Sequence, residues 1–210
     1  MKKKLTLIFD FDGTIADSLK DLEGFVRLAF RELKSREITK EEIYCLRNQS
    51  LKDAFRKLDV PLIKLPFLLK KHGQTDRDYG RMKPILGMKK ALASLRNTGI
   101  ELGILTSNSK EKVDEFVRAN DMDIFDFIYW GGHLFGKAQK IKRILKTRKL
   151  DPKNVIYIGD EVRDMTAAKK AGIKSGAVCW GLNTEEILKK QEPDFIFRKP
   201  QDLIVFNGEF

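Results

Sequence analysis

The sequence predicts an α/β protein, a doubly wound parallel sheet with a small helical insert after its first strand. Six short runs of apolar residues are typical of buried strands, and helical patterns lie between most of them. This alternation indicates a parallel sheet covered by helices on both faces. Between residues 16 and 82, however, we find no convincing strand, only helical patterns. We therefore expect a core domain at 1–15 and 83–210 and a helical domain at 16–82.

The strands are expected where nearly every residue is apolar, because a parallel strand is buried on both faces. In chain order they are LTLIF (5–9), IELGILT (100–106), DFIYW (126–130), NVIYIG (154–159), SGAVCW (175–180) and DFIFR (194–198). Helices of the core are expected at 88–99, 109–120, 137–149 and 164–172, and those of the insert at 18–37, 39–48 and 50–60. Gly172 is typical of a helix C-cap and Ser50 of an N-cap.

Composition limits the class of protein. The chain has 210 residues, of which 42% are hydrophobic, enough for a real core. Cys45 and Cys179 fit no metal-binding spacing and indicate a reducing compartment. The apolar run after the basic start ends at Asp10, too soon for a signal peptide, and no stretch approaches the roughly 20 apolar residues of a membrane span. We expect a cytoplasmic protein with no membrane partner.

The chain carries a net charge of +11, which is a feature of some nucleic-acid binders. Its lysines and arginines are spread along the whole chain, and segments such as 137–149 place apolar residues at helical spacing among them. This pattern favours solvated basic helix faces over a nucleic-acid site. A general attraction for anionic substrates is expected instead.

Polar side chains gather where the predicted strands end. Ligands of open parallel sheets bind beyond the carboxyl ends of the strands. The residues at those ends are Asp10 and Asp12 after the first strand, Thr106, Ser107 and Asn108 after the second, and Asp160, Glu161 and Asp164 after the fourth. Carboxylates collected at one edge repel one another, and a hard divalent cation relieves that repulsion. Mg²⁺ suits a site of a few carboxylates and waters.

The spacing of Asp10 and Asp12 suits phosphoryl transfer. Residues two apart in an extended chain point the same way, so both can face one site while Phe11 turns away. A carboxylate nucleophile can form an acyl phosphate. Its neighbour can protonate the leaving group and then deprotonate water.

Four motifs in this order resemble the haloacid dehalogenase superfamily of phosphohydrolases, over nearly the whole chain. They are DFDGT (Asp10 to Thr14), Thr106 in LTSN, Lys137 in FGKAQK, and GDEVRD with Asp160 and Asp164. The insert resembles the cap domain of phosphoglycolate phosphatase-like members.

The resemblance implies roles for these residues. Asp10 is expected to be the nucleophile and Asp12 the general acid/base, with Thr106 and Lys137 binding the phosphoryl oxygens. Mg²⁺ is expected on Asp10, Asp160 and the backbone carbonyl of Asp12, with Asp164 acting through water. The expected activity is Mg²⁺-dependent hydrolysis of a small phosphorylated metabolite, such as phosphoglycolate or a sugar phosphate, through an aspartyl-phosphate.

Two positions depart from the family pattern. The lysine motif often reads KPxP, whereas Lys137 is followed by Ala138, Gln139 and Lys140, which leaves Lys140 as the alternative lysine. Glu161 stands where a small hydroxyl residue is common, either as an additional acid near the site or as the start of a helix. Within the cap, a turn containing Arg47, Asn48, Ser50 and Lys52 either faces the site, with Arg47 and neighbours binding substrate, or is an exposed polar turn.

Three other functions fit parts of the sequence. A phosphomutase would use the same intermediate. GGHLFGKA (131–138) differs from a nucleotide-binding P-loop by one residue, Ala138, which lacks the hydroxyl that would bind Mg²⁺. A basic module that binds nucleic acid is the non-enzymatic alternative. The two histidines, His72 and His133, have no partners for nucleophilic catalysis and are interpreted as structural or surface residues.

Overall fold

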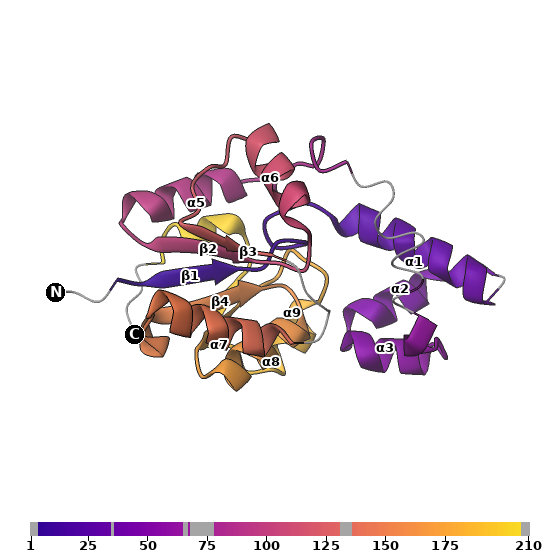
Figure 1. Cartoon of the computed structure of the whole chain (residues 1–210). Helices are drawn as coiled ribbons and strands as arrows, with labels where there is room; N and C mark the ends of the chain where they lie inside the picture. The colour runs from indigo at the N-terminus through magenta and orange to yellow at the C-terminus, as the bar shows by residue number, and fades with distance from the viewer. Residues whose placement is uncertain (1–3, 35, 65–66, 68–77, 131–135, 207–210) are drawn as a thin grey trace.

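The computed structural model describes residues 4–34, 36–64, 67, 78–130 and 136–206 (Figure 1). Its centre is a six-stranded, wholly parallel sheet with the strand order β3-β2-β1-β4-β5-β6. The strands are β1 (Thr6–Phe9), β2 (Glu101–Leu105), β3 (Phe127–Tyr129), β4 (Val155–Gly159), β5 (Lys174–Val178) and β6 (Phe195–Phe197). All six strands and the doubly wound sheet predicted from the sequence are confirmed.

The order of the strands reverses beside β1. From β1 the chain builds outward through β2 and β3, and then returns to the other side of β1 to add β4, β5 and β6. The carboxyl ends of β1 and β4 therefore flank the topological switch point, where ligands of open α/β sheets bind. Phe9 pairs with Ile104 on one side and Ile158 on the other, so the residues that follow these strands meet at one edge.

Helices cover both faces of the sheet. α5 (Met88–Asn97) and α6 (Lys110–Ala119) lie on one face, and α7 (Lys137–Arg148) and α8 (Val162–Ala171) lie on the other (Figure 1). Alternate residues of β1 enter the two layers, because Leu7 and Phe9 belong to one apolar cluster and Ile8 to the other. All three are fully buried. α9 (Glu185–Lys189) and the 3₁₀ turns η2 (Pro152–Asn154) and η3 (Pro200–Leu203) complete the core.

The insert is helical in its described part. It contains α1 (Leu19–Lys34), α2 (Lys40–Arg47), α3 (Leu51–Lys57) and the 3₁₀ turn η1 (Leu62–Lys64), and no strand is found in the described residues between 17 and 82. These helices pack around their own apolar cluster, which includes Phe25, Phe30, Leu46, Ala54 and Val60. They lie beyond the carboxyl end of β1 (Figure 1). The division at residues 16 and 82 stays a prediction.

Several local predictions are confirmed as well. The Ser50 hydroxyl accepts a hydrogen bond from the backbone N–H of Asp53, as an N-cap does. Gly172 closes α8 with a φ of 74°, a left-handed conformation that favours glycine. None of the described helices has the length and apolar character that crossing a bilayer requires.

Candidate active site

Three carboxylates meet at the edge where β1 and β4 end. Asp10 follows β1, Asp160 follows β4, and Asp164 lies in the first turn of α8. One oxygen of each lies within 4.8 Å of the other two, and all three residues are buried. Burial, and then the neighbouring carboxylates, raise the pKa of Asp160 well above its ordinary value. Burial also raises the pKa of Asp164 to about 6.

Lys137 is the cation that contacts this cluster. It is the first residue of α7, and its Nζ lies 2.9 Å from Oδ2 of Asp10 and 2.5 Å from Oδ1 of Asp164. Burial alone would lower the pKa of Lys137, but the two carboxylates raise it well above its ordinary value. Lys140, the alternative lysine, forms no ion pair with a described residue. Burial and the charge of Lys137 lower its pKa. Of the two lysines, Lys137 therefore contacts the carboxylates.

Asp160 is held on both of its carboxylate oxygens. The Thr14 hydroxyl donates to Oδ1 at 2.9 Å, and the backbone N–H of Leu182 donates to Oδ2 at 2.7 Å. Two glycines allow this close packing. A Cβ on Gly181 would lie 2.1 Å from the Cβ of Asp160, and one on Gly13 would lie 2.4 Å from Oδ2. The orientation of Asp160 therefore depends on the loop that follows β5.

Asp12 stands apart from the cluster of three. Its carboxylate accepts a hydrogen bond from Nδ2 of Asn108 at 2.7 Å, and Asn108 in turn accepts one from the Tyr79 hydroxyl at 3.1 Å. The Thr106 hydroxyl accepts from the backbone N–H of Asn108, also at 3.1 Å, and Thr106 is buried at the end of β2. Asn108, two residues beyond Thr106, thus orients the carboxylate of Asp12.

The residues predicted to bind substrate are only partly brought together. Thr106, Asn108 and Lys137 lie in the site, while Ser107 is exposed at its border. Arg47, in the last turn of α2, donates to the carbonyls of Gly181 and Leu182 at 3.2 and 3.0 Å, so it joins the insert to the loop after β5. A substrate-binding role for Arg47 stays a prediction. The side chain of Lys52, both histidines and residues 131–135 of the P-loop-like segment lie outside the described residues.

The sequence pointed to Thr14 only as the last residue of the DFDGT motif, and its hydrogen bond to Asp160 was not expected. Tyr79, Leu182 and Asn183, which also hydrogen-bond to groups around the site, were missed. Leu182 and Asn183 had a usable signal, because the rule that directs attention to strand ends applies to β5 too. Tyr79 had none, since its contact with Asn108 spans 29 residues of sequence.

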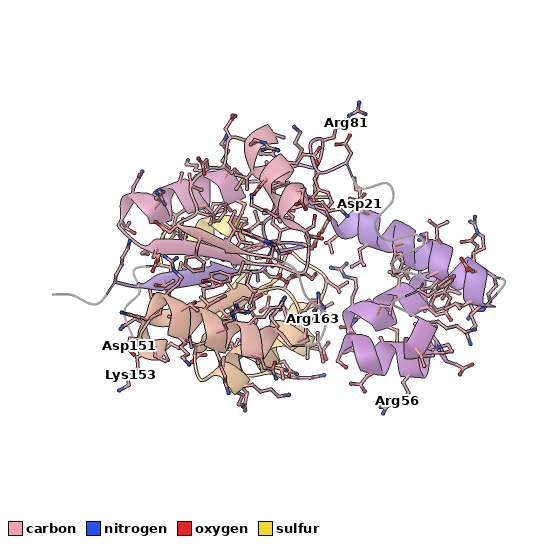
Figure 2. All side chains as sticks on the ribbon, viewed as in Figure 1. Asp21, Arg56, Arg81, Asp151, Lys153 and Arg163 are labelled. Carbon is pink, nitrogen blue, oxygen red and sulfur yellow. The ribbon has the colours of Figure 1, made fainter. Side chains whose placement is uncertain are left out.

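Glu161 and Arg163 form an ion pair at the start of α8. A guanidinium nitrogen of Arg163 donates to Oε1 of Glu161 at 2.5 Å, and the backbone N–H of Glu161 donates to Asp164. Figure 2 shows Arg163 at the border of the core that faces the inserted helices. Glu161 is the N-cap residue of α8, so the position left open by the sequence both begins the helix and adds an acid beside the site.

The donor set fits a divalent cation. Among the described residues, one ammonium group forms ion pairs with this cluster of three buried carboxylates, which leaves excess negative charge in a region where desolvation is costly. All the ligand atoms are hard oxygens, the type that Mg²⁺ prefers. Asp10, Asp160 and Asp164, which could supply these oxygens, all belong to the core.

Comparison with known proteins agrees with this geometry. The chain is 29% identical over 203 residues to a phosphoglycolate phosphatase of Synechococcus elongatus, with 94% of each chain covered. It is 25% identical over 218 residues to the pyrophosphatase PpaX of Anoxybacillus flavithermus, with 97% of this chain and 96% of the relative covered.

The fold also has close structural counterparts. A haloacid dehalogenase-like hydrolase from Streptococcus pneumoniae superposes with a TM-score of 0.80 at 23% identity, covering 98% of this chain and 99% of the other. The family model for haloacid dehalogenase-like hydrolases matches residues 7–178, which include every residue of the carboxylate cluster and Lys137. The prediction of an enzyme is thereby confirmed, and the chain belongs to the haloacid dehalogenase-like hydrolase family.

Proposed function

We propose that this chain is a Mg²⁺-dependent phosphatase that hydrolyses a small phosphorylated metabolite through an aspartyl-phosphate on Asp10. The observation that carries the proposal is the cluster of Asp10, Asp160 and Asp164, with Lys137 in contact with two of its members. The names of the curated relatives, a phosphoglycolate phosphatase and a pyrophosphatase, support a phosphate ester or anhydride as substrate.

In this proposal Asp10 is the nucleophile and Asp12 is the general acid and base. Its carboxylate attacks phosphorus, and the bond between phosphorus and the leaving oxygen breaks. Asp12, oriented by Asn108, donates its proton to that oxygen. Asp12 then takes a proton from a water molecule, which attacks the acyl phosphate and releases inorganic phosphate. Asp10 is thereby regenerated.

Binding of the phosphoryl group falls to the residues around these two acids. Lys137 would place its positive charge on the transferring oxygens, and Thr106 would donate its hydroxyl to them. Asp10, Asp160, Asp164 and the backbone carbonyl of Asp12 would hold the metal ion. When bound, Mg²⁺ supplies charge neutralisation between the nucleophile and the phosphate dianion.

The test is phosphate release from p-nitrophenyl phosphate with and without Mg²⁺. Asp10→Asn should abolish release, and EDTA should abolish that of the unchanged protein. Asp17→Asn is the matched control, because Asp17 is an exposed acid in the same stretch of chain. Phosphate release that survives both EDTA and the Asp10→Asn substitution would exclude the mechanism.

A screen of phosphorylated metabolites, including phosphoglycolate, sugar phosphates and pyrophosphate, would define the substrate. Transfer of phosphate to an added sugar phosphate, in place of its release to water, would identify a mutase instead. We also infer a cytoplasmic location, which the free state of Cys45 and Cys179 supports.

A further inference from the structure

We propose that Asn183 is a positioning residue that couples the docking of the inserted helices, through residues 47–49, to the placement of the metal ligand Asp160. The inference rests on the metal site of the proposed function and extends it to a residue outside the four motifs. The juxtaposition that carries it is one buried amide lying between the insert and the loop that holds Asp160.

Asn183 uses every polar group of its side chain in contacts between separate parts of the chain. Its Oδ1 accepts from the backbone N–H of Val162 at 2.8 Å, in the first turn of α8. Its Nδ2 donates to the carbonyls of Arg47 and Gln49 at 2.9 and 3.2 Å, both in the insert. Only 3% of Asn183 is exposed. A buried amide placed in this way joins the start of α8 to the insert.

The backbone around Asn183 holds Asp160 directly. The N–H of Asn183 donates to the carbonyl of Asp160 at 3.1 Å, and the N–H of the preceding residue, Leu182, donates to the Asp160 carboxylate at 2.7 Å. Gly181 packs against the Asp160 side chain with no room for a Cβ. A shift of residues 181–183 would therefore move a hydrogen-bond donor away from the carboxylate of the proposed metal ligand Asp160.

The insert also forms hydrogen bonds with the same loop through Arg47 and Asn48. Arg47 donates to the carbonyls of Gly181 and Leu182, and its own carbonyl accepts from the backbone N–H of Thr184 at 3.1 Å. The Thr184 hydroxyl donates to Oδ1 of Asn48 at 2.6 Å. Leu182 is thus held by Arg47 at its carbonyl and holds Asp160 through its N–H.

These contacts make the two placements interdependent. If the insert moves away, Asn183 loses two acceptors and the loop loses two donors, and unsatisfied buried polar groups are costly. The loop then relaxes, and Asp160 loses part of its support. Partners that orient metal ligands typically change metal affinity by about 10- to 100-fold when they are removed. We therefore expect a substitution in the insert that breaks these contacts to lower the affinity for the metal ion.

The test measures Mn²⁺ binding to the full chain by electron paramagnetic resonance, with Mn²⁺ as the observable substitute for Mg²⁺ and with no substrate present. Arg47→Ala and Asn183→Ala should each weaken binding by about tenfold. Their combined variant should weaken it by less than the product of the single effects, because both act through residues 181–183. Gln49→Ala is the control, since only its backbone carbonyl contacts Asn183.

The sign of the Arg47→Ala effect separates this coupling from simple electrostatics. Removing a positive charge near a cation site would by itself strengthen Mn²⁺ binding, whereas the coupling weakens it. Unchanged or tighter binding by Arg47→Ala overturns the inference. Because Arg47 is exposed, we expect its replacement to leave the fold intact.

Phosphate release by the unchanged protein is measured in parallel. If that protein binds Mn²⁺ but hydrolyses no ester, the proposed function fails, and the coupling is still decided by the affinities. If it binds no Mn²⁺, both are wrong.

Discussion

The ammonium group of Lys137 lies 2.9 Å from Oδ2 of Asp10, although 127 residues separate them in the sequence. The start of α7 carries this lysine to the end of β1, where it also contacts Asp164. The pair is buried, with 14% of the lysine side chain and 7% of the aspartate side chain exposed. The positive charge of Lys137 therefore offsets the cost of burying the negative charge of Asp10, and the reverse also holds.

Removing that cation should destabilise the metal-free protein. Lys137→Met keeps an unbranched apolar side chain but leaves two buried carboxylates without their ion pair, a loss typically worth about 3–5 kcal/mol. We expect the free energy of unfolding in EDTA to fall by about that amount, and added Mg²⁺ to restore part of it. Denaturant unfolding measures both values. Lys140→Met, one turn along the same helix, should change neither appreciably, and an equal effect of the two variants would contradict the assignment.

Asn108 should matter most for poor leaving groups. Its amide orients the carboxylate of Asp12, the proposed proton donor. We expect Asn108→Ala to lower kcat/KM for an alkyl phosphate by about tenfold or more, since general acid catalysis contributes about 10²- to 10⁴-fold. This ratio excludes the later hydrolysis of the acyl phosphate, in which Asp12 also acts and which is the same for every ester. The effect on p-nitrophenyl phosphate should be smaller, because nitrophenolate leaves without protonation. Steady-state kinetics with both esters, using Ser107→Ala as the neighbouring control, measures the difference. Equal losses for the two esters would argue against Asp12 as the acid.

Two glycines offer a matched pair of alanine substitutions. At Gly181 a Cβ would lie 2.1 Å from the Cβ of Asp160, so Gly181→Ala must displace the loop or the aspartate. We expect a loss of about 1–3 kcal/mol, as for other overpacked sites, together with weaker Mg²⁺ binding. At Gly24, within α1, a Cβ meets no atom within 4 Å. Gly24→Ala should therefore stabilise the protein by about 0.5–1 kcal/mol.

Thermal unfolding with and without Mg²⁺ distinguishes the two substitutions. The midpoint should fall for Gly181→Ala and rise for Gly24→Ala. The rise in the unfolding midpoint that Mg²⁺ causes should become smaller only in Gly181→Ala. If Mg²⁺ raises the midpoint of Gly181→Ala as much as that of the unchanged protein, the loop tolerates the extra carbon.

Cys179 should react slowly with alkylating reagents. Burial, and then the charge of Glu185, raise the pKa of its thiol to about 11 from an ordinary 9.0. At pH 8 this lowers the thiolate fraction by about a hundredfold, and the greater nucleophilicity of a more basic thiolate recovers about a tenfold factor. We expect alkylation by iodoacetamide about tenfold slower than for an unperturbed thiol. The rate should keep rising as the pH passes 10.

Mass spectrometry of a Cys45→Ser variant, in which Cys179 is the remaining thiol, measures that rate. A cysteine in an unfolded sample of the same variant is the reference. Equal rates in the folded and unfolded samples would contradict the raised pKa.

Local pattern was enough to predict the core and its edge. The runs around Leu7 and Ile156 are apolar throughout because parallel strands are buried on both faces, and both became central strands of the sheet. Asp10, Thr106 and Asp160 could be grouped in advance because the carboxyl ends of parallel strands share an edge. The motif favoured Lys137 and left Lys140 as the alternative, and the packed structure shows that Lys137, the first residue of α7, contacts the carboxylates.

The sequence by itself determined the succession of strands and helices along the chain, the helical insert and the acids at the strand ends, because these depend on periodicity and on residue type. The tertiary structure decided which groups touch. Only the packed chain brings Asn108 to hydrogen-bond with Asp12, and Thr14 with Asp160. It also brings Arg47 and Asn183 together, where they join the insert to the loop after β5. The physical reason is that these contacts join segments up to 146 residues apart, and hydrogen bonds of a few ångströms leave no periodic trace in the sequence.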